Sequence, residues 1–563
     1  MKVIIVGGVA GGATAAARIR RLDEHAEITV FERSGYISYA NCGLPYYIGD
    51  VITDPEALTL QTPESFFKRF RINMKIHHEV ISIHPDRKIV SVKNLENDEI
   101  FEENYDKLIL SPGAKPTQPR LSGVGIDKLF TLRTVEDTFR IKEYINKNHP
   151  KSAVLAGGGF IGLELAENLR ELGMDVTIVQ RPKQLMNPFD PDMASMIHNE
   201  MRKHGIKLVL GYTVEGFKEK DNGVEVLLKD NPSLQADMVV LAIGVTPDTV
   251  LAKEAGLELG IKESIVVNDR METSVPDIYA AGDAVQVKHY VTGNDALISL
   301  AGPANKQGRI IADNICGGDS RYLGSQGSSV IKVFDMTAAT TGINETNAKK
   351  SGLEVDTVIL SPMSHAGYYP GGKVMTMKVV FEKESYRLLG AQIIGYEGVD
   401  KRIDVLATAI HAGLNATQLK DLDLAYAPPY SSAKDPVNMA GFMIDNIAKG
   451  TLKQWHLEDM DKISKDKDVV LIDVRTVCEF SRGHIDGFKN IPVDELRERI
   501  SEIEKGKPVY LICQSGLRSY IASRILEGNG YETYNFSGGF RFYDAVVNDR
   551  ALIERAYACG MDY

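Results

Sequence analysis

Two cysteines of this chain stand in segments whose residue types could carry sulfur chemistry. Cys513 directly follows the apolar run Val509-Tyr510-Leu511-Ile512 and opens the segment Cys513-Gln514-Ser515-Gly516-Leu517-Arg518. In a turn from a strand into a helix, backbone N–H groups, the helix dipole and Arg518 would stabilise a thiolate and an anion bound above it. This C-x4-R loop is one residue shorter than the C-x5-R loop that phosphatases fit to phosphate, so it favours a persulfide sulfur.

Cys42 lies in Ser38-Tyr39-Ala40-Asn41-Cys42-Gly43-Leu44-Pro45-Tyr46-Tyr47, which contains no second cysteine. A lone thiol cannot close an internal disulfide, so its oxidised form must be a sulfenic acid or a mixed disulfide with a small thiol. The other cysteines, Cys316, Cys478 and Cys559, stand in no comparable context. We expect them to be ordinary small residues.

Two segments repeat a pattern that is typical of dinucleotide binding. Residues 2–32 and 152–180 each read as strand, glycine turn, helix and strand, with the turns Gly7-Gly8-Val9-Ala10-Gly11-Gly12 and Gly157-Gly158-Gly159-Phe160-Ile161-Gly162. A dinucleotide pyrophosphate sits on the helix N-terminus that follows such a turn. The second turn matches G-x-G-x-x-G in full, whereas Val9 holds the middle glycine position of the first. Glu32 is placed to accept the ribose hydroxyls of an adenosine.

The composition excludes several classes of protein. With 563 residues, 44% apolar and 25% charged, the chain is expected to fold into about three or four globular domains. Its net charge of −11 argues against nucleic acid as the main partner. No apolar run is long enough for a membrane span, and five scattered cysteines form no disulfide framework. We therefore expect a cytoplasmic protein with reduced thiols, and no metal site.

Further segments resemble a known family over roughly residues 1–450. Tyr105 to Ala114 and Thr273 to Asp283 resemble the flavin signatures of the two-dinucleotide-domain disulfide reductases. Where glutathione-reductase-like members carry a second cysteine, this chain has Tyr47. It therefore resembles the single-cysteine pyridine nucleotide-disulfide oxidoreductases, which include coenzyme A (CoA) disulfide reductases, NADH oxidases and NADH peroxidases. The oxidases and peroxidases carry a histidine at the position of Ala10, which counts here against peroxide or oxygen as substrate.

The same resemblance implies cofactors, a homodimer and a set of site residues. Gly367 to Gly372 and Ala425 to Ser431 resemble segments that bring two tyrosines, here Tyr368 and Tyr426, onto the partner subunit's Cys42, where they would assist a leaving thiolate. The residues expected at FAD are Gly7, Val9, Ala10, Gly11, Gly12, Glu32, Arg33, Asn41, Ser111, Pro112, Gly113, Gly282 and Asp283. Those expected at NADH or NADPH are Gly157, Gly159, Phe160, Ile161, Gly162, Glu164, Gln180 and Gly244. Those expected at CoA are Arg18, Arg21, Ser38, Asn41, Cys42, Phe66 and Arg69, drawn partly from the basic clusters that also contain Arg20, Lys68 and Arg71.

The C-terminal part resembles a rhodanese domain over about residues 460–555. Leu471 to Arg475, Gly483 to Gly487 and Gly538 to Phe540 surround the Cys513 loop in the chain. A rhodanese fold without activity is the alternative, and the intact cysteine argues against it.

Together these patterns predict an α/β protein with two Rossmann-like domains, an α+β dimerisation domain and an α/β rhodanese domain. The expected boundaries are residues 1–115 with 250–325 for FAD, 116–249 for NAD(P)H, 326–450 for dimerisation and 451–563 for the rhodanese domain. The expected function is NAD(P)H-dependent reduction of CoA disulfide, CoA persulfide or polysulfide at Cys42, with Cys513 receiving and presenting sulfane sulfur. An oxidase or peroxidase, and a sulfur carrier with a regulatory flavin part, remain the alternatives. The choice between NADH and NADPH stays open, since Gln180 replaces an acidic residue and Arg181 follows it.

Overall fold

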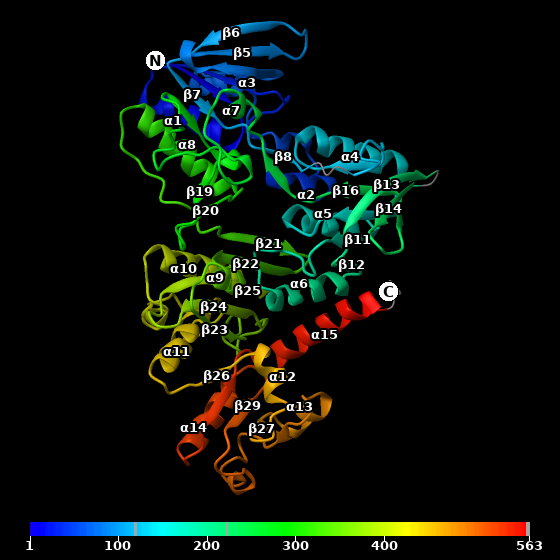
Figure 1. Cartoon of the computed structure of the whole chain (residues 1–563), viewed down its shortest axis with the longest axis vertical. Helices are drawn as coiled ribbons and strands as arrows, with labels where there is room; N and C mark the ends of the chain where they lie inside the picture. Colours follow the sequence, from blue (N-terminus) through cyan, green and yellow to red (C-terminus); the bar gives the residue numbers. More distant parts are fainter. Residues whose placement is uncertain (118–120, 221–222, 559–563) are drawn as a thin grey trace. The chain divides into compact units, whose positions relative to one another are not determined.

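The computed structural model describes residues 1–117, 121–220 and 223–558, and Cys559 lies outside them. The chain forms two compact units, and many of their elements are labelled in Figure 1. Unit 1 is Met1–Lys183 with Gly205–Gly327, and unit 2 is Gln184–His204 with Ser328–Tyr563. Across the described residues, we find no helix that combines the length and apolarity needed to span a bilayer.

The first half of unit 1 is a parallel sheet in the order β18-β7-β1-β2-β3. Helix α1 (Ala10–Leu22) packs on α8 (Ala301–Ile315), and a Cβ added to Gly308 would stand 2.4 Å from the Gly11 oxygen. The two helices therefore approach closely because both contact residues are glycines. The strands are β1 (Lys2–Val6), β2 (Glu27–Phe31), β3 (Asn73–Lys75), β7 (Lys107–Leu110) and β18 (Ile278–Ala280).

The second half of unit 1 repeats this plan with a parallel sheet in the order β12-β11-β10-β16-β9. Its helices include α4 (Val135–Asn148) and α5 (Phe160–Glu171). The strands are β9 (Leu129–Thr131), β10 (Ser152–Ala156), β11 (Asp175–Gln180), β12 (Lys207–Leu210) and β16 (Met238–Leu241). Two antiparallel sheets accompany the halves: β4 (His78–His84), β5 (Ile89–Asn94) and β6 (Ile100–Asn104), and β13 (Val214–Lys220), β14 (Gly223–Leu228) and β15 (Leu234–Ala236).

Unit 2 begins with an antiparallel sheet in the order β21-β22-β25-β24-β23, which confirms the predicted α+β arrangement. Helix α10 (Val399–His411) packs against β22 and β25. The strands are β21 (Ser329–Val333), β22 (Met336–Gly342), β23 (Val355–Leu360), β24 (Thr376–Glu382) and β25 (Leu388–Gly395). The other helices are α6 (Pro191–Lys203), α9 (Glu345–Lys350) and α11 (Pro436–Ala448).

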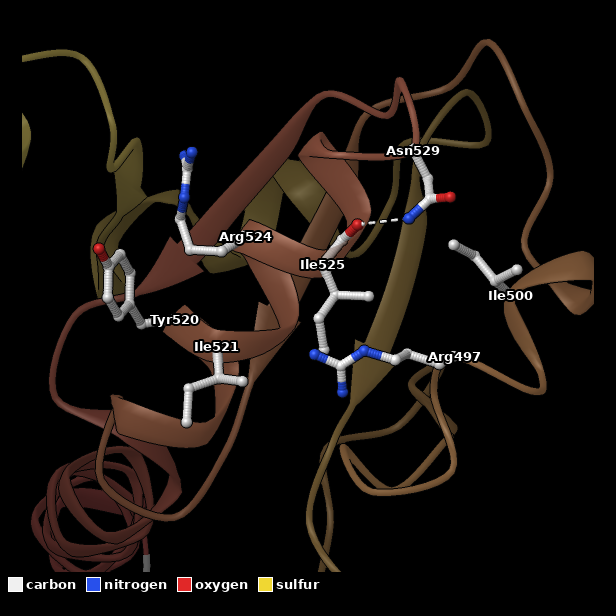
Figure 2. A pocket seen from close by; sticks show the side chains of 7 residues that line it. All are labelled: Arg497, Ile500, Tyr520, Ile521, Arg524, Ile525 and Asn529. Carbon is white, nitrogen blue, oxygen red and sulfur yellow. Dashed lines mark hydrogen bonds between the residues drawn. The ribbon is translucent and has the colours of Figure 1, made fainter.

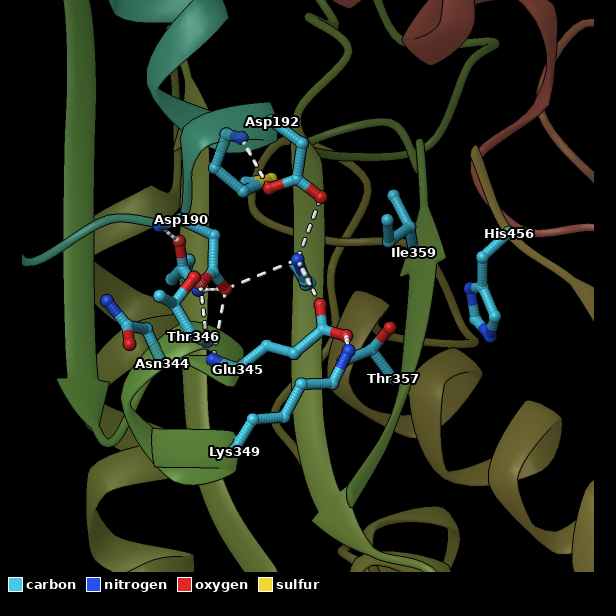
Figure 3. Close-up of polar contacts among 12 residues, drawn as sticks. Asp190, Asp192, Asn344, Glu345, Thr346, Lys349, Thr357, Ile359 and His456 are labelled. Atoms are coloured by element: carbon cyan, nitrogen blue, oxygen red, sulfur yellow. Dashed lines mark hydrogen bonds and ion pairs between the residues drawn. The ribbon is translucent and has the colours of Figure 1, made fainter. Parts of the chain in front are cut away.

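A buried ion cluster ties α6 and α9 to this sheet (Figure 3). The ammonium of Lys378, on β24, lies 3.2 Å from Asp190, 2.8 Å from Asp192 and 2.7 Å from Glu345. Burial alone would lower the pKa of Lys378, but the three carboxylates outweigh it and raise that pKa. A lysine so deeply buried is retained in charged form because its partners surround it.

The last part of unit 2 is a parallel sheet in the order β26-β30-β29-β27-β28. Helix α12 (Met460–Ile463), whose Met460 and Ile463 are buried, lies between the first two strands of this sheet in the chain. The strands are β26 (Gln454–Trp455), β27 (Val470–Asp473), β28 (Lys489–Asn490), β29 (Val509–Ile512) and β30 (Thr533–Phe536). The helices are α13 (Val477–Arg482), α14 (Leu517–Glu527) and α15 (Gly539–Ala558).

Helix α15 docks this C-terminal domain onto α6. His198 Nδ1 and Arg202 Nη1 lie 2.8 and 2.5 Å from the two carboxylate oxygens of Asp549. His198 Nε2 accepts from the Leu185 N–H at 2.9 Å, so Nδ1 carries the proton and donates to Asp549. Asp549 and His198 are both 1% exposed, so the contact is dry.

A second docking contact joins the edge strands of the two sheets. His456 Nε2 lies 3.0 Å from an Asp356 oxygen, and the Ile359 N–H donates to Ser537 Oγ at 3.0 Å. Strand β23 is the edge of its sheet, so these contacts cover backbone groups that an edge otherwise leaves unpaired. The C-terminal domain is thus held at two places within unit 2.

Candidate functional site

The first glycine turn has no room for side chains at two of its glycines. Gly7 has φ +95°, and a Cβ there would stand 2.1 Å from the Ser111 oxygen. A Cβ on Gly12 would stand 1.9 Å from the Gly7 oxygen. Glu32 directly follows β2 and accepts from the Gly8 N–H at 2.8 Å, while burial raises its pKa. The structure therefore brings Glu32 to the turn, as the spacing predicts.

The second turn repeats this geometry. Gly157 has φ +123°, and a Cβ on Gly162 would stand 2.1 Å from the Gly157 oxygen. At Gly159 an added Cβ would meet nothing within 4 Å, so the turn is open on that side. The Gln180 amide oxygen accepts from the Gly158 N–H at 3.1 Å, in the manner of Glu32. Phe160 and Ile161 begin α5, and Gly244 has φ +105° after β16.

The helices that leave these turns are uncapped. The N-cap residues, Val9 of α1 and Gly159 of α5, make no side-chain hydrogen bond, and neither helix has an acidic residue in its first turn. By contrast, α4 begins with a capping box of Thr134 and Asp137. Uncapped N-termini leave N–H groups and the positive end of the helix dipole for an anion. Both turns therefore fit a dinucleotide pyrophosphate.

Arg133, which no motif predicted, joins several of the residues expected at the flavin. Its Nη2 donates to Asp283 at 2.6 Å, and its Nε donates to the Ala114 oxygen at 3.2 Å. The Asn41 amide can donate to the Arg133 oxygen at 3.1 Å. Asp283, one of the residues expected at FAD, is thus an ion-pair partner of Arg133. Arg33, also expected at FAD, pairs with Asp248 at 2.9 Å.

Cys42 lies in a short 3-10 turn, Asn41–Gly43, directly before α2 (Leu44–Ile48), which packs against α5. Burial raises the pKa of Cys42, Glu164 raises it further, and Arg133 opposes them. Burial and Glu167 raise the pKa of Glu164 itself to about 7. The chain alone therefore favours the thiol of Cys42 and places beside it a carboxyl able to exchange a proton near neutral pH.

Tyr47, at the position of the missing second cysteine, packs its ring against Phe139 of α4 with centroids 5.6 Å apart. Because a tyrosine occupies this position, the segment contains no second thiol beside Cys42. The sequence-based expectation of a single reactive cysteine is consistent with this packing.

The two predicted tyrosines lie together in unit 2. Their hydroxyls form a hydrogen bond of 2.6 Å, and the side chains of Tyr368 and Tyr426 are 76% and 45% exposed. The bond to Tyr368 raises the pKa of Tyr426. Two exposed phenols that share one hydrogen bond form a surface pair able to donate to a third group.

Buried Arg402, which no motif predicted, holds the segments that carry these tyrosines. Its Nη2 donates to the Ser364 oxygen at 3.0 Å and to the Tyr430 oxygen at 3.2 Å. Ser364 and Tyr430 each lie four residues from one of the tyrosines along the chain. One guanidinium therefore fixes the spacing of the two segments.

Cys513 is 1% exposed at the end of β29, and two donors point at its sulfur. The Gly516 N–H and the Ser519 hydroxyl lie 3.1 and 3.2 Å from Sγ. The Phe540 N–H donates to the Cys513 oxygen at 2.8 Å, so residues 538–540 pack closely against the loop. The predicted cradle is present, and Ser519 is an additional donor that the motif did not predict.

Arg518 points to a different partner from the one expected. Its Nη1 and Nη2 donate to the two carboxylate oxygens of Glu479, both at 2.7 Å. The bonds from Arg518 lower the pKa of Glu479 to about 2. Thr476 donates to the same carboxylate through its N–H and its hydroxyl. The loop arginine is therefore held in a saturated ion pair, and sequence spacing gave no sign of it.

The cations expected at CoA fall into two groups. Arg18 pairs with Asp313 at 2.8 Å, and buried Arg20 donates to backbone carbonyls that include that of Phe70. Within the described ranges, exposed Arg21 and Arg69 form no ion pair. Two other residues expected at CoA also have structural contacts. Phe66 is buried and packs against Phe70. Ser38 has φ +44°, and its N–H donates a hydrogen bond to the Gly8 oxygen. Arg21 and Arg69 thus remain open to a phosphate, whereas Arg18 and Arg20 have structural partners.

A hollow of about 500 Å³ lies along α14, beyond the Cys513 loop (Figure 2). Two arginines and one tyrosine stand among isoleucines there, and Arg524 also pairs with Glu527. Its lining was not predicted from the sequence: Arg497, Ile500, Tyr520, Ile521, Arg524, Ile525 and Asn529.

Comparisons with known proteins agree with this geometry. The family model of pyridine nucleotide-disulphide oxidoreductases matches residues 1–308, that of their dimerisation domain residues 328–436, and the rhodanese-like domain residues 456–545. The chain belongs to the pyridine nucleotide-disulphide oxidoreductases. It is 38% identical over 442 residues to the CoA disulfide reductase of Staphylococcus aureus. The matched region covers 78% of this chain and 99% of that protein.

Two solved structures are similar over nearly the whole chain. One is reduced Bacillus anthracis CoADR-RHD, with 48% identity, 98% of each chain covered and a TM-score of 0.95. The other is an NAD-dependent persulfide reductase from A. fulgidus, with 38% identity, 96% of this chain and 100% of that chain covered, and a TM-score of 0.90. The predicted sequence of two dinucleotide domains, a dimerisation domain and a rhodanese domain is thereby confirmed.

Proposed function

We propose that this chain is an FAD-dependent reductase that uses NADH or NADPH to reduce CoA disulfide, CoA persulfide or polysulfide at Cys42. The observation that carries the proposal is the lone thiol of Cys42 in the same unit as two uncapped glycine turns, with Tyr47 in place of a second cysteine. The names of the similar reductases support the substrate class. In this reading Cys513 accepts sulfane sulfur and presents it for reduction.

The residues around Cys42 would act on a disulfide in two stages. The thiolate of Cys42 attacks one sulfur of R–S–S–R′, forms a mixed disulfide with R, and releases R′S⁻, which takes up a proton. FAD, held at the first glycine turn by residues that include Gly7 and Glu32, would supply the transfer of two electrons from the reduced pyridine nucleotide to the sulfur. With those electrons and one proton, the mixed disulfide returns to the Cys42 thiolate and RSH. Glu164, whose pKa is raised to about 7, would hold or release that proton.

Tyr368 and Tyr426 would serve the partner subunit's Cys42 in a homodimer, which the dimerisation domain supports. A phenol donates a hydrogen bond to a leaving thiolate and so lowers the barrier to S–S cleavage. The shared hydrogen bond keeps both hydroxyls at one point, where either can donate to the sulfur.

The oxidase or peroxidase alternative is less well supported because Ala10 stands where those enzymes carry a histidine. The sulfur-carrier alternative rests on the intact Cys513 cradle. Oxygen or peroxide consumption with turnover would favour the first alternative. Full activity of a Cys42→Ser enzyme in a sulfur-transfer assay would favour the second.

Mass spectrometry of the purified enzyme tests the proposal directly. We expect about one CoA per protomer, bound to Cys42 as a mixed disulfide and absent from Cys42→Ser. Reductive titration should then consume about four electrons per protomer, two for FAD and two for the disulfide. A Cys42→Ser enzyme with wild-type disulfide reductase activity would overturn the proposal, while Cys316→Ser serves as the matched thiol control.

A further inference from the structure

The cation of the Cys513 loop is neutralised by a residue on another helix. Arg518 and Glu479 form a bidentate ion pair, in which two parallel hydrogen bonds of 2.7 Å join the guanidinium to the carboxylate. Glu479 is the third residue of α13 after its N-cap, Thr476, whose N–H and hydroxyl bind the same carboxylate. The carboxylate therefore stays in place and stays ionised, with its pKa lowered to about 2.

The loop consequently presents few charges to an incoming donor. At Cys513 the groups that face the sulfur are the Gly516 N–H and the Ser519 hydroxyl, both neutral donors. Arg518, the one cation in the loop, is occupied by Glu479. A donor with two negative charges would need a free cation here, whereas a persulfide with at most one charge would not.

We infer that Glu479 determines the donor specificity of Cys513, favouring organic persulfides over thiosulfate. This inference rests on the proposed function, in which Cys513 accepts sulfane sulfur. With thiosulfate, the Cys513 thiolate attacks the outer sulfur, the S–S bond breaks, and sulfite leaves with both negative charges. With a persulfide R–S–SH, the thiolate takes the outer sulfur, and R–SH leaves with the proton. In both cases the product at Cys513 is a persulfide anion.

The charge at the loop can be set to three values by substitution. The Arg518–Glu479 pair is neutral in the wild type, Glu479→Gln leaves one positive charge, and Arg518→Leu leaves one negative charge. Rates of Cys513 persulfide formation are measured by intact mass in the full chain with Cys42→Ser, so that sulfur stays on Cys513. The donors are thiosulfate and cysteine persulfide.

We expect thiosulfate rates, relative to cysteine persulfide rates, to rise roughly tenfold in Glu479→Gln and to fall roughly tenfold in Arg518→Leu. The gain should shrink at high salt, which a mere change in loop shape would not cause. Glu479→Gln combined with Arg518→Leu should return the ratio to near the wild-type value. Glu502→Gln is the matched control, since Glu502 binds Arg499 through the same fork elsewhere in the domain.

Two outcomes would overturn the inference. One is an unchanged donor ratio in both single variants, and the other is a gain in Glu479→Gln that persists when Arg518 is also removed. If Glu479→Gln loses reaction with both donors, Arg518→Leu alone decides, because it leaves the α13 cap intact. A wild-type protein that takes sulfur from neither donor would instead refute the proposed function of Cys513.

Discussion

Replacing Asp549 by asparagine should loosen the C-terminal domain from α6. Asp549 accepts from His198 Nδ1–H at 2.8 Å and from Arg202 at 2.5 Å. His198 cannot change tautomer without losing the bond that its Nε2 accepts from Leu185. An asparagine amide offers one oxygen and one NH2 group, so it can accept from only one of the two donors and turns its own donor toward the other.

The expected cost follows from burial. A hydrogen bond to a charged group contributes about 1.5–3 kcal/mol, and a buried donor left unpaired costs a similar amount. His198 is 1% exposed, so the full cost of an unpaired buried donor applies to it. The Arg202 side chain is 23% exposed and can form a hydrogen bond to water instead, so its loss costs less. The sum is about 3 kcal/mol, which corresponds to a rise of roughly 100-fold in the population of undocked domain.

Amide hydrogen exchange measures this population directly. In Asp549→Asn, amides of α6 and α15 at the contact should exchange up to roughly 100-fold faster, while those of β1 and β7 in unit 1 should not change. Asp544→Asn is the matched control, because Asp544 lies on the same helix but is exposed and bonds only within α15. Unchanged exchange at α6 and α15 would show that Asp549 does not hold the domain, and would refute this reasoning.

Four further results are expected. The docking of His456 on Asp356 should weaken as pH rises, because the bond to Asp356 outweighs the effect of burial and raises the pKa of His456 in the folded protein. The stabilisation is therefore full below about pH 6.5 and is lost as the pH rises through the folded-state pKa. Amide exchange at β23, measured as a function of pH, checks this, and His456→Gln should show no such dependence. Gly162→Ala should lower the melting temperature because its Cβ would meet the Gly157 oxygen at 2.1 Å. Gly159→Ala, whose Cβ would meet nothing within 4 Å, should leave the melting temperature near that of the wild type and raise the KM for the pyridine nucleotide. Equal losses of stability in the two variants would contradict the geometry. Mixed dimers of Cys42→Ser and Tyr426→Phe protomers should regain part of the disulfide reductase activity lost in each parent, since one hybrid site receives both wild-type groups; a fully active monomer would rule out this arrangement. Cys513→Ser should slow reduction of a protein persulfide while sparing small disulfides, and stopped-flow rates that are unchanged for both substrates would show two independent activities.

The elements that carry the cofactor turns could be predicted from the sequence because their constraints are local. A glycine turn between a strand and a helix needs positive φ or close backbone contact, as Gly7 and Gly162 show, and these needs leave a mark on neighbouring residues. The Cys513 loop is also local, since its donors follow within six residues of the sulfur. Motif spacing therefore identified both thiols, both turns and the order of the domains.

The charge partners of these sites were decided by tertiary structure. Arg133 reaches Asp283 across 150 residues of chain, and Arg518 reaches Glu479 across 39. Each is an isolated ionic residue in its own segment, so its partner depends on which elements the fold brings side by side. The same holds for Asp549 on His198, separated by 351 residues. The sequence by itself determined the residue types and the local loops of these sites. The packing of distant elements decided which charged groups pair with one another, because ion pairing depends on distance in space and not along the chain.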